Sequence, residues 1–203
     1  MFLEIGRRRP PSSPADLLVE CHGRIRHFLS IALRLSGLEP IPLNEVEEAA
    51  KRVRRYFAEA LPLHVADEEE LIAPLLLGKD ATVSAALVRM ADEHQRQQAS
   101  LERVLEVCRV LAVTPEHLPD VRDELRVAGE ALRSELIPHL EEEEHTVFPA
   151  LARYLSGAEQ DGIMVAMRLR RERHLEGGAV RRPVGGDRSP SLRVGPRKSE
   201  VTG

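Results

Sequence analysis

Apolar positions recur along most of the chain with the period of an amphipathic α-helix. From Leu18 onward they return every three or four residues, and Ile25 and Leu29 continue the same stripe. Ser13 is suited to cap the start of such a helix, and Gly37 is suited to end it. The pattern therefore predicts a first helix between these two residues.

Three further helical stretches follow, and their expected ranges are 44–77, 81–113 and 119–156. Asn44 and Asp80 have side chains that accept hydrogen bonds from the first free N–H groups of a helix, so we expect them as caps. Pro62 and Pro138 lie inside the second and fourth stretches, where a missing N–H should bend the helix. Short loops join all four stretches.

Four long helices with short connections predict an all-α fold, an up-down-up-down four-helix bundle. A short fifth helix and a polar tail rich in Gly, Pro and Arg should follow the bundle. The expected divisions are an N-terminal tail over 1–12, the bundle over 13–156, an appended helix over 157–175 and a disordered tail over 176–203.

Composition agrees with a helical protein and narrows its partners. Apolar residues make up 42% of the chain and aromatic residues only 3%, which disfavours a strand-rich core. A net charge of −4 with mixed signs gives no basic footprint for nucleic acid. No apolar stretch is long enough for a membrane span. The two cysteines form no disulfide framework, so we expect a cytoplasmic protein, and its oligomeric state is left open.

One pattern, His-x3-Glu-x5-Pro, occurs twice. It begins at His64 with Glu68 in the second predicted helix, and at His139 with Glu143 in the fourth. Residues four apart lie on one helix face, so each pair can converge on one metal ion, or its carboxylate can bridge two. The second and fourth helices are the parallel, diagonal pair of such a bundle, and the two motifs should therefore face each other.

The first and third helices each add one histidine on an apolar stripe, His22 and His94. Four imidazoles and two carboxylates supply two histidines per metal and two bridging groups, with positions left open. That donor set suits iron. The candidate metal ligands are His22, His64, Glu68, His94, His139 and Glu143.

Together these six residues resemble the ligand pattern of the hemerythrin family in its bacterial HHE cation-binding form, and the resemblance covers residues 13–156. It implies two non-haem iron ions held by the six residues with a bridging oxygen species. Oxygen-carrying members add a fifth histidine one turn from the third-helix histidine. Here Met90 and Gln98 occupy those positions beside His94, which leaves a coordination site for water, peroxide or another small ligand.

Other acidic and histidine residues are assigned outside the ligand set. Glu69 and Glu142 are the nearest alternatives to the two motif glutamates, but neither is four residues after a histidine, so Glu69→Gln is predicted to be nearly silent. Glu135 could orient His139, although an ion pair with a nearby arginine is the favoured reading. We expect the remaining histidines at the surface, namely His27, His117, His145 and His174.

The site suggests three functions. The preferred one is a binding protein that holds oxygen or iron for sensing, storage or delivery, and no catalytic residue is assigned. An enzyme that reduces peroxide or nitrogen oxides is the second, since an open site admits oxygen, peroxide or nitric oxide. A metal-free structural bundle is the third.

Overall fold

The computed structural model describes residues 11–180, and side-chain environments up to residue 175. The predicted tails lie outside this part over residues 1–10 and 181–203. The helices are α1 (Pro14–Leu35), α2 (Leu43–Arg55), η1 (Tyr56–Ala60), α3 (Leu61–Ala66), η2 (Asp67–Ile72), α4 (Ala73–Leu76), α5 (Ala81–Leu111), η3 (Pro115–His117), α6 (Leu118–Glu142), η4 (Glu143–Val147), α7 (Phe148–Tyr154) and α8 (Gly157–Val180).

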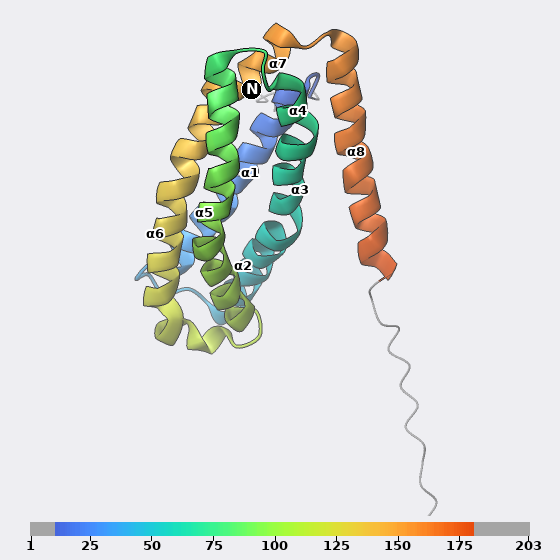
Figure 1. The fold of residues 1–203 in the computed structure, drawn as a ribbon. Coiled ribbons are helices and arrows are strands. Elements are labelled where there is room, and N and C mark those ends of the chain that lie inside the picture. Colours follow the sequence, from blue (N-terminus) through green and yellow to red (C-terminus); the bar gives the residue numbers. More distant parts are fainter. Residues whose placement is uncertain (1–10, 181–203) are drawn as a thin grey trace, which may run out of the picture.

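The predicted all-α bundle is confirmed. One helical column runs from α2 to α4 and another from α6 to α7, and with α1 and α5 they form the bundle (Figure 1). α1 packs against α2 and α6, and α5 packs against the same two, so α2 and α6 lie on a diagonal. In the part of the chain that the structure covers, no helix is long and apolar enough to cross a membrane.

Two of the three predicted caps are confirmed. The Ser13 side chain accepts a hydrogen bond from a backbone N–H of the first turn at 3.1 Å, and the Asp80 carboxylate accepts two, at 2.8 and 3.1 Å. Asn44 was the wrong cap for the second column. That helix begins at Leu43, and Pro42 precedes it with extended backbone and no side-chain bond. The proline carbonyl accepts the first helical N–H groups, which places Asn44 inside the first turn.

The core consists of two apolar clusters separated by a polar layer. One contains Phe57 and Leu132, and the other contains Ile72 and Leu151. Both exclude water, which supplies most of the driving force for folding. His22 lies in α1 between residues that belong to the two clusters, so the polar layer is in the middle of the bundle and not at its surface.

α8 is longer than the predicted appended helix and is attached to the bundle by charge as well as by apolar contact. Its Arg170 Nε lies 3.0 Å from Asp67 Oδ1, and Arg171 Nη1 lies 2.7 Å from Asp67 Oδ2. Asp67 is fully buried, and Ile163 and Met167 of α8 pack in the second apolar cluster. Figure 1 shows α8 running down one side of the bundle, with the chain passing to it from α7 at the top of the view.

Truncation should separate α8 from the chain that follows it. Deleting residues 157–203 removes three buried apolar side chains, Ile163, Met164 and Met167, and both partners of Asp67, so we expect the melting temperature to fall by about 5–10 °C. Deleting only 181–203 removes no described contact, and its melting curve should match that of the full chain. Equal destabilisation by both deletions, measured by circular dichroism, would contradict this role for α8.

Candidate metal centre

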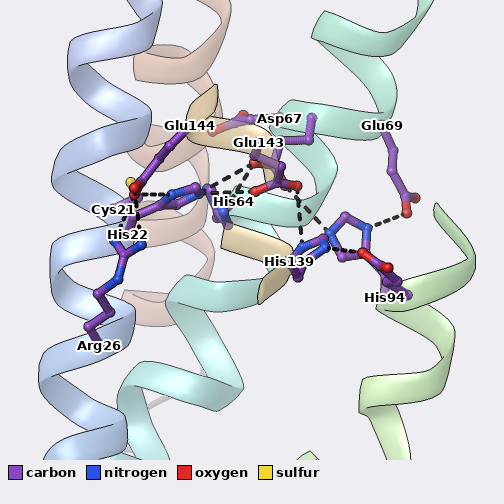
Figure 2. Close-up of polar contacts among 12 residues, drawn as sticks. Cys21, His22, Arg26, His64, Asp67, Glu69, His94, His139, Glu143 and Glu144 are labelled. Atoms are coloured by element: carbon purple, nitrogen blue, oxygen red, sulfur yellow. Dashed lines mark hydrogen bonds and ion pairs between the residues drawn. The ribbon is translucent and has the colours of Figure 1, made fainter. Parts of the chain in front are cut away.

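The six predicted ligands converge in the polar layer from four sides of the bundle. They come from α1, α3, η2, α5, α6 and η4, in the order His22, His64, Glu68, His94, His139 and Glu143. Five of them are at most 4% exposed, and the His94 side chain is 8% exposed. Figure 2 shows the imidazoles gathered around the carboxylates between the helices. The structure therefore brings together every residue of the predicted set.

Each glutamate presents its two oxygens to two different histidines. Glu143 Oε2 lies 3.1 Å from His22 Nε2, and Glu143 Oε1 lies 3.2 Å from His139 Nε2. Glu68 Oε1 lies 3.2 Å from His64 Nε2, and Glu68 Oε2 lies 3.6 Å from His94 Nε2. This is the arrangement of a carboxylate that bridges two positions, each flanked by a pair of imidazoles.

The same atoms form two compact donor groups, within each of which all ligand atoms lie within 4.8 Å of one another. The first contains His22, His64, Glu68 and Glu143, and the second contains His94, His139 and Glu143. Glu143 belongs to both groups, so the two candidate metal positions are adjacent.

The inward atoms lack hydrogen bonds. The Nε2 atoms of His22, His64 and His94 and all four oxygens of Glu68 and Glu143 are buried without a hydrogen-bond partner among the described residues. Leaving buried polar groups unpaired is unfavourable, and native proteins rarely do so. Cations coordinated by these atoms would satisfy them, and imidazole with carboxylate is a donor set that iron accepts. The residues present therefore fit a two-metal centre.

The electrostatics of the metal-free site indicate the same need for positive charge. Burial raises the pKa of Glu68 well above its ordinary value, and the neighbouring Glu143 raises it further. Burial opposes protonation of His22, but the two carboxylates outweigh it and raise its pKa to about 9. Burial lowers the pKa of His64 and of His94. In the absence of a metal ion, Glu68 and Glu143 therefore favour a protonated, positively charged His22.

Three of the four histidines are held from behind by a carboxylate on Nδ1. The pairs are His22 with Glu144 at 2.8 Å, His94 with Glu69 at 2.8 Å and His139 with Glu93 at 2.9 Å. A carboxylate that accepts the Nδ1 proton leaves the Nε2 lone pair free for a metal and fixes the ring orientation. Arg26 in turn donates to the two oxygens of Glu144 from its two terminal guanidinium nitrogens, as Figure 2 shows.

These outer carboxylates were not identified from the sequence. Each lies beside a ligand along the chain: Glu69 follows Glu68, Glu144 follows Glu143, and Glu93 precedes His94. This adjacency to a ligand was the feature of the sequence that could have identified them. It was overlooked because Glu69 and Glu144 lie within runs of acidic residues.

The role predicted for Glu69 needs revision, because its carboxylate lies against a ligand. We expect Glu69→Gln to weaken iron binding by roughly 10–100-fold, the usual effect of losing a partner that orients a metal-bound histidine. Glu141→Gln, an exposed change in the other acidic run, is the matched control. Competition with a chelator of known affinity measures both, and equal affinities for the two variants would contradict this assignment.

The predictions for the other histidines and for Glu142 are confirmed, and the prediction for Glu135 is wrong. His27, His117, His145 and His174 are exposed, as predicted. Glu142 forms an ion pair with Arg89 away from the cluster. Glu135 was predicted to pair with an arginine, but it accepts a 2.6 Å hydrogen bond from Ser100 of α5, which the bundle brings opposite it.

The proline of the repeated motif has a backbone role. In each motif the glutamate carbonyl accepts the N–H of the residue five positions on, Ala73 for Glu68 and Phe148 for Glu143. These are π-helical bonds, and η2 and η4 are π turns that contain the two glutamates. The motif proline comes next, and because it has no N–H for the carbonyl four residues earlier, the wider turn is favoured there.

The two prolines at which kinks were predicted, Pro62 and Pro138, differ in whether a π turn precedes them. Pro62 follows a third π turn, η1, whose closing bond runs from Leu61 N–H to the Tyr56 carbonyl. Pro138 lies inside α6 without such a turn. A π turn thus precedes both prolines that come after the glutamates, Pro74 and Pro149. Of the two prolines that come before the histidines, only Pro62 has one.

Comparison with known proteins gives one match. The family model described as hemerythrin HHE cation binding domain matches residues 13–151, which include all six converging side chains. No curated protein and no solved structure matches the chain.

Proposed function

The chain belongs to the hemerythrin HHE cation-binding family, and on that premise we propose that its six converging residues bind two non-haem iron ions with a bridging oxygen species. The observation that carries the proposal is the orientation of Glu68 and Glu143. Each directs its two oxygens toward two different imidazoles. A metal-free structural bundle offers no reason to bury so many unpaired donors.

Iron in such a centre supplies reversible one-electron chemistry and a site for a small ligand. The protein residues hold and tune it. The four Nε2 atoms are the donors, and Glu68 and Glu143 offset part of the cationic charge. Glu144, Glu69 and Glu93 retain the Nδ1 protons and keep three rings in place.

The preferred function is binding of oxygen or iron for sensing, storage or delivery. The cavity beside the centre is lined by apolar, amide, imidazole and carboxylate side chains. Both cysteines, Cys21 and Cys108, are free and buried, in keeping with a reducing cytoplasm.

Reduction of peroxide or nitrogen oxides is the alternative, and the positions flanking His94 favour it. Met90 lies in an apolar cluster, and Gln98 is exposed with its amide donating to Glu102 at 2.8 Å. Neither supplies a fifth imidazole, so a coordination site remains for an added ligand. An oxygenated form should then be short-lived, and azide should bind the di-ferric state.

Metal analysis tests the proposal directly. After anaerobic loading with ferrous iron and removal of the excess, the protein should retain two iron ions per chain. Air oxidation should then give near-ultraviolet absorption that azide shifts. A stable content of one ion per chain, or retention of a single zinc ion in preference to iron, would exclude the two-iron centre.

A further inference from the structure

A cavity of about 450 Å³ lies beside the centre. Its lining residues come mainly from α3, α5 and α6, with others from α1 and η2, and they include the candidate ligands His64, His94 and His139. Leu101, Leu132 and Leu136 are among the apolar side chains that line it. A water molecule occupies roughly 30 Å³ in the liquid, whereas pockets for small organic ligands begin near 300 Å³. The cavity is therefore much larger than oxygen, peroxide or nitric oxide requires.

One buried amide in this wall lacks a partner. Gln97 is 6% exposed and lines the cavity, and its side-chain nitrogen has no hydrogen-bond partner among the described residues. It lies three residues after His94, so both side chains belong to one face of α5. A buried donor without an acceptor is unfavourable, and a ligand oxygen in the cavity would supply that acceptor.

The charges around the cavity favour a neutral ligand. Glu69 and Glu70 are among the residues that line it, and none of the lining residues is lysine or arginine. Glu70 is paired with Arg170 at 2.9 Å, but this guanidinium is not part of the wall. Apart from any bound iron, an anionic ligand would meet carboxylates here and no lysine or arginine.

We propose that this cavity binds a neutral, mainly aliphatic molecule with a terminal oxygen, whose chain contacts the leucines and whose oxygen accepts a hydrogen bond from Gln97. The oxygen then lies beside His94 and His139. This inference depends on the proposed function in one respect, namely that iron is bound at His94 and His139. The cavity and the free amide are properties of the chain itself.

Titration calorimetry with straight-chain alcohols tests the proposal on the protein as purified, with iron measured in the same sample. Two added methylenes, from 1-butanol to 1-hexanol, should increase affinity about tenfold because each CH₂ gains burial. In chelator-treated protein, where no iron adjoins the cavity, 1-hexanol should bind more tightly than hexanoate. Affinity that does not change with chain length, or a preference for hexanoate, would overturn the proposal.

Substitutions locate the polar contact. Gln97→Leu keeps the approximate size but removes the donor, and it should weaken 1-hexanol binding roughly three- to tenfold. Gln160→Leu, which lies outside the cavity and whose amide donates to the Leu155 carbonyl oxygen, should leave binding unchanged. Equal effects of the two variants would remove Gln97 from the site. An iron content of two with no alcohol binding would refute this inference alone. Alcohol binding by protein that retains no iron after anaerobic loading would refute the proposed function alone.

Discussion

Glu143→Gln is expected to reduce the iron content from two ions per chain to one or none, while the chain remains helical. The carboxylate lies 3.1 Å from His22 Nε2 and 3.2 Å from His139 Nε2, so it belongs to both halves of the centre. An amide has the same shape but carries no charge and offers one oxygen instead of two. The loss in affinity should exceed the roughly 10–100-fold effect of an outer partner.

Glu142→Gln is the matched control for that experiment. It precedes the ligand by one residue, and its surface pair with Arg89 contributes little to stability. Iron content by mass spectrometry and helicity by circular dichroism should both be unchanged. Loss of iron from Glu142→Gln with Glu143→Gln unaffected would mean that the ligand register is displaced by one residue. Glu68→Gln should behave like Glu143→Gln.

Removal of iron should lower the melting temperature by about 5–15 °C. A ligand at 100–1,000 times its dissociation constant adds about 2.7–4.1 kcal/mol to the free energy of unfolding. For a chain of this size each kcal/mol corresponds to roughly 2–4 °C. The metal-free protein also retains two buried carboxylates, Glu68 and Glu143, close to each other, which adds repulsion.

Differential scanning calorimetry of iron-loaded and chelator-treated protein measures this shift. The Glu143→Gln variant should melt below the iron-loaded wild-type protein, since it lacks one or both of the cations that the buried donors need. Identical melting temperatures for loaded and metal-free wild-type protein would instead favour a bundle whose stability is independent of metal.

The helices and the six-residue set could be predicted because each depends on local spacing. Apolar residues three or four apart define the faces, and a histidine four residues before a glutamate places both on one face. Convergence of His22 and His94 then followed from bundle topology. The cap at Asn44 failed because Pro42 starts the helix two residues earlier, a choice between two local signals.

The outer contacts could not be predicted, because they depend on which residues the packing brings together. Glu93 meets His139 from the neighbouring helix, and Asp67 meets Arg171 across more than half of the chain. Glu93 and Asp67 each have acidic neighbours along the chain, so the sequence around them does not distinguish them from those neighbours. Only the assembled bundle distinguishes the members that are buried from those that face solvent.

The π turns make the centre more sensitive to the length of its helices than to their composition. A π turn is an α-helix that holds one residue in excess, and each residue rotates a helix by about 100°. Because a π turn absorbs its extra residue locally, deleting Thr146 would let η4 close to a regular helix, with Phe148 and α7 in nearly the same orientation relative to His139. What the deletion would remove is the wide turn that carries Glu143. Over generations, loss of a single codon between the histidine and the proline of each motif should therefore disturb the centre more than the helix that follows it.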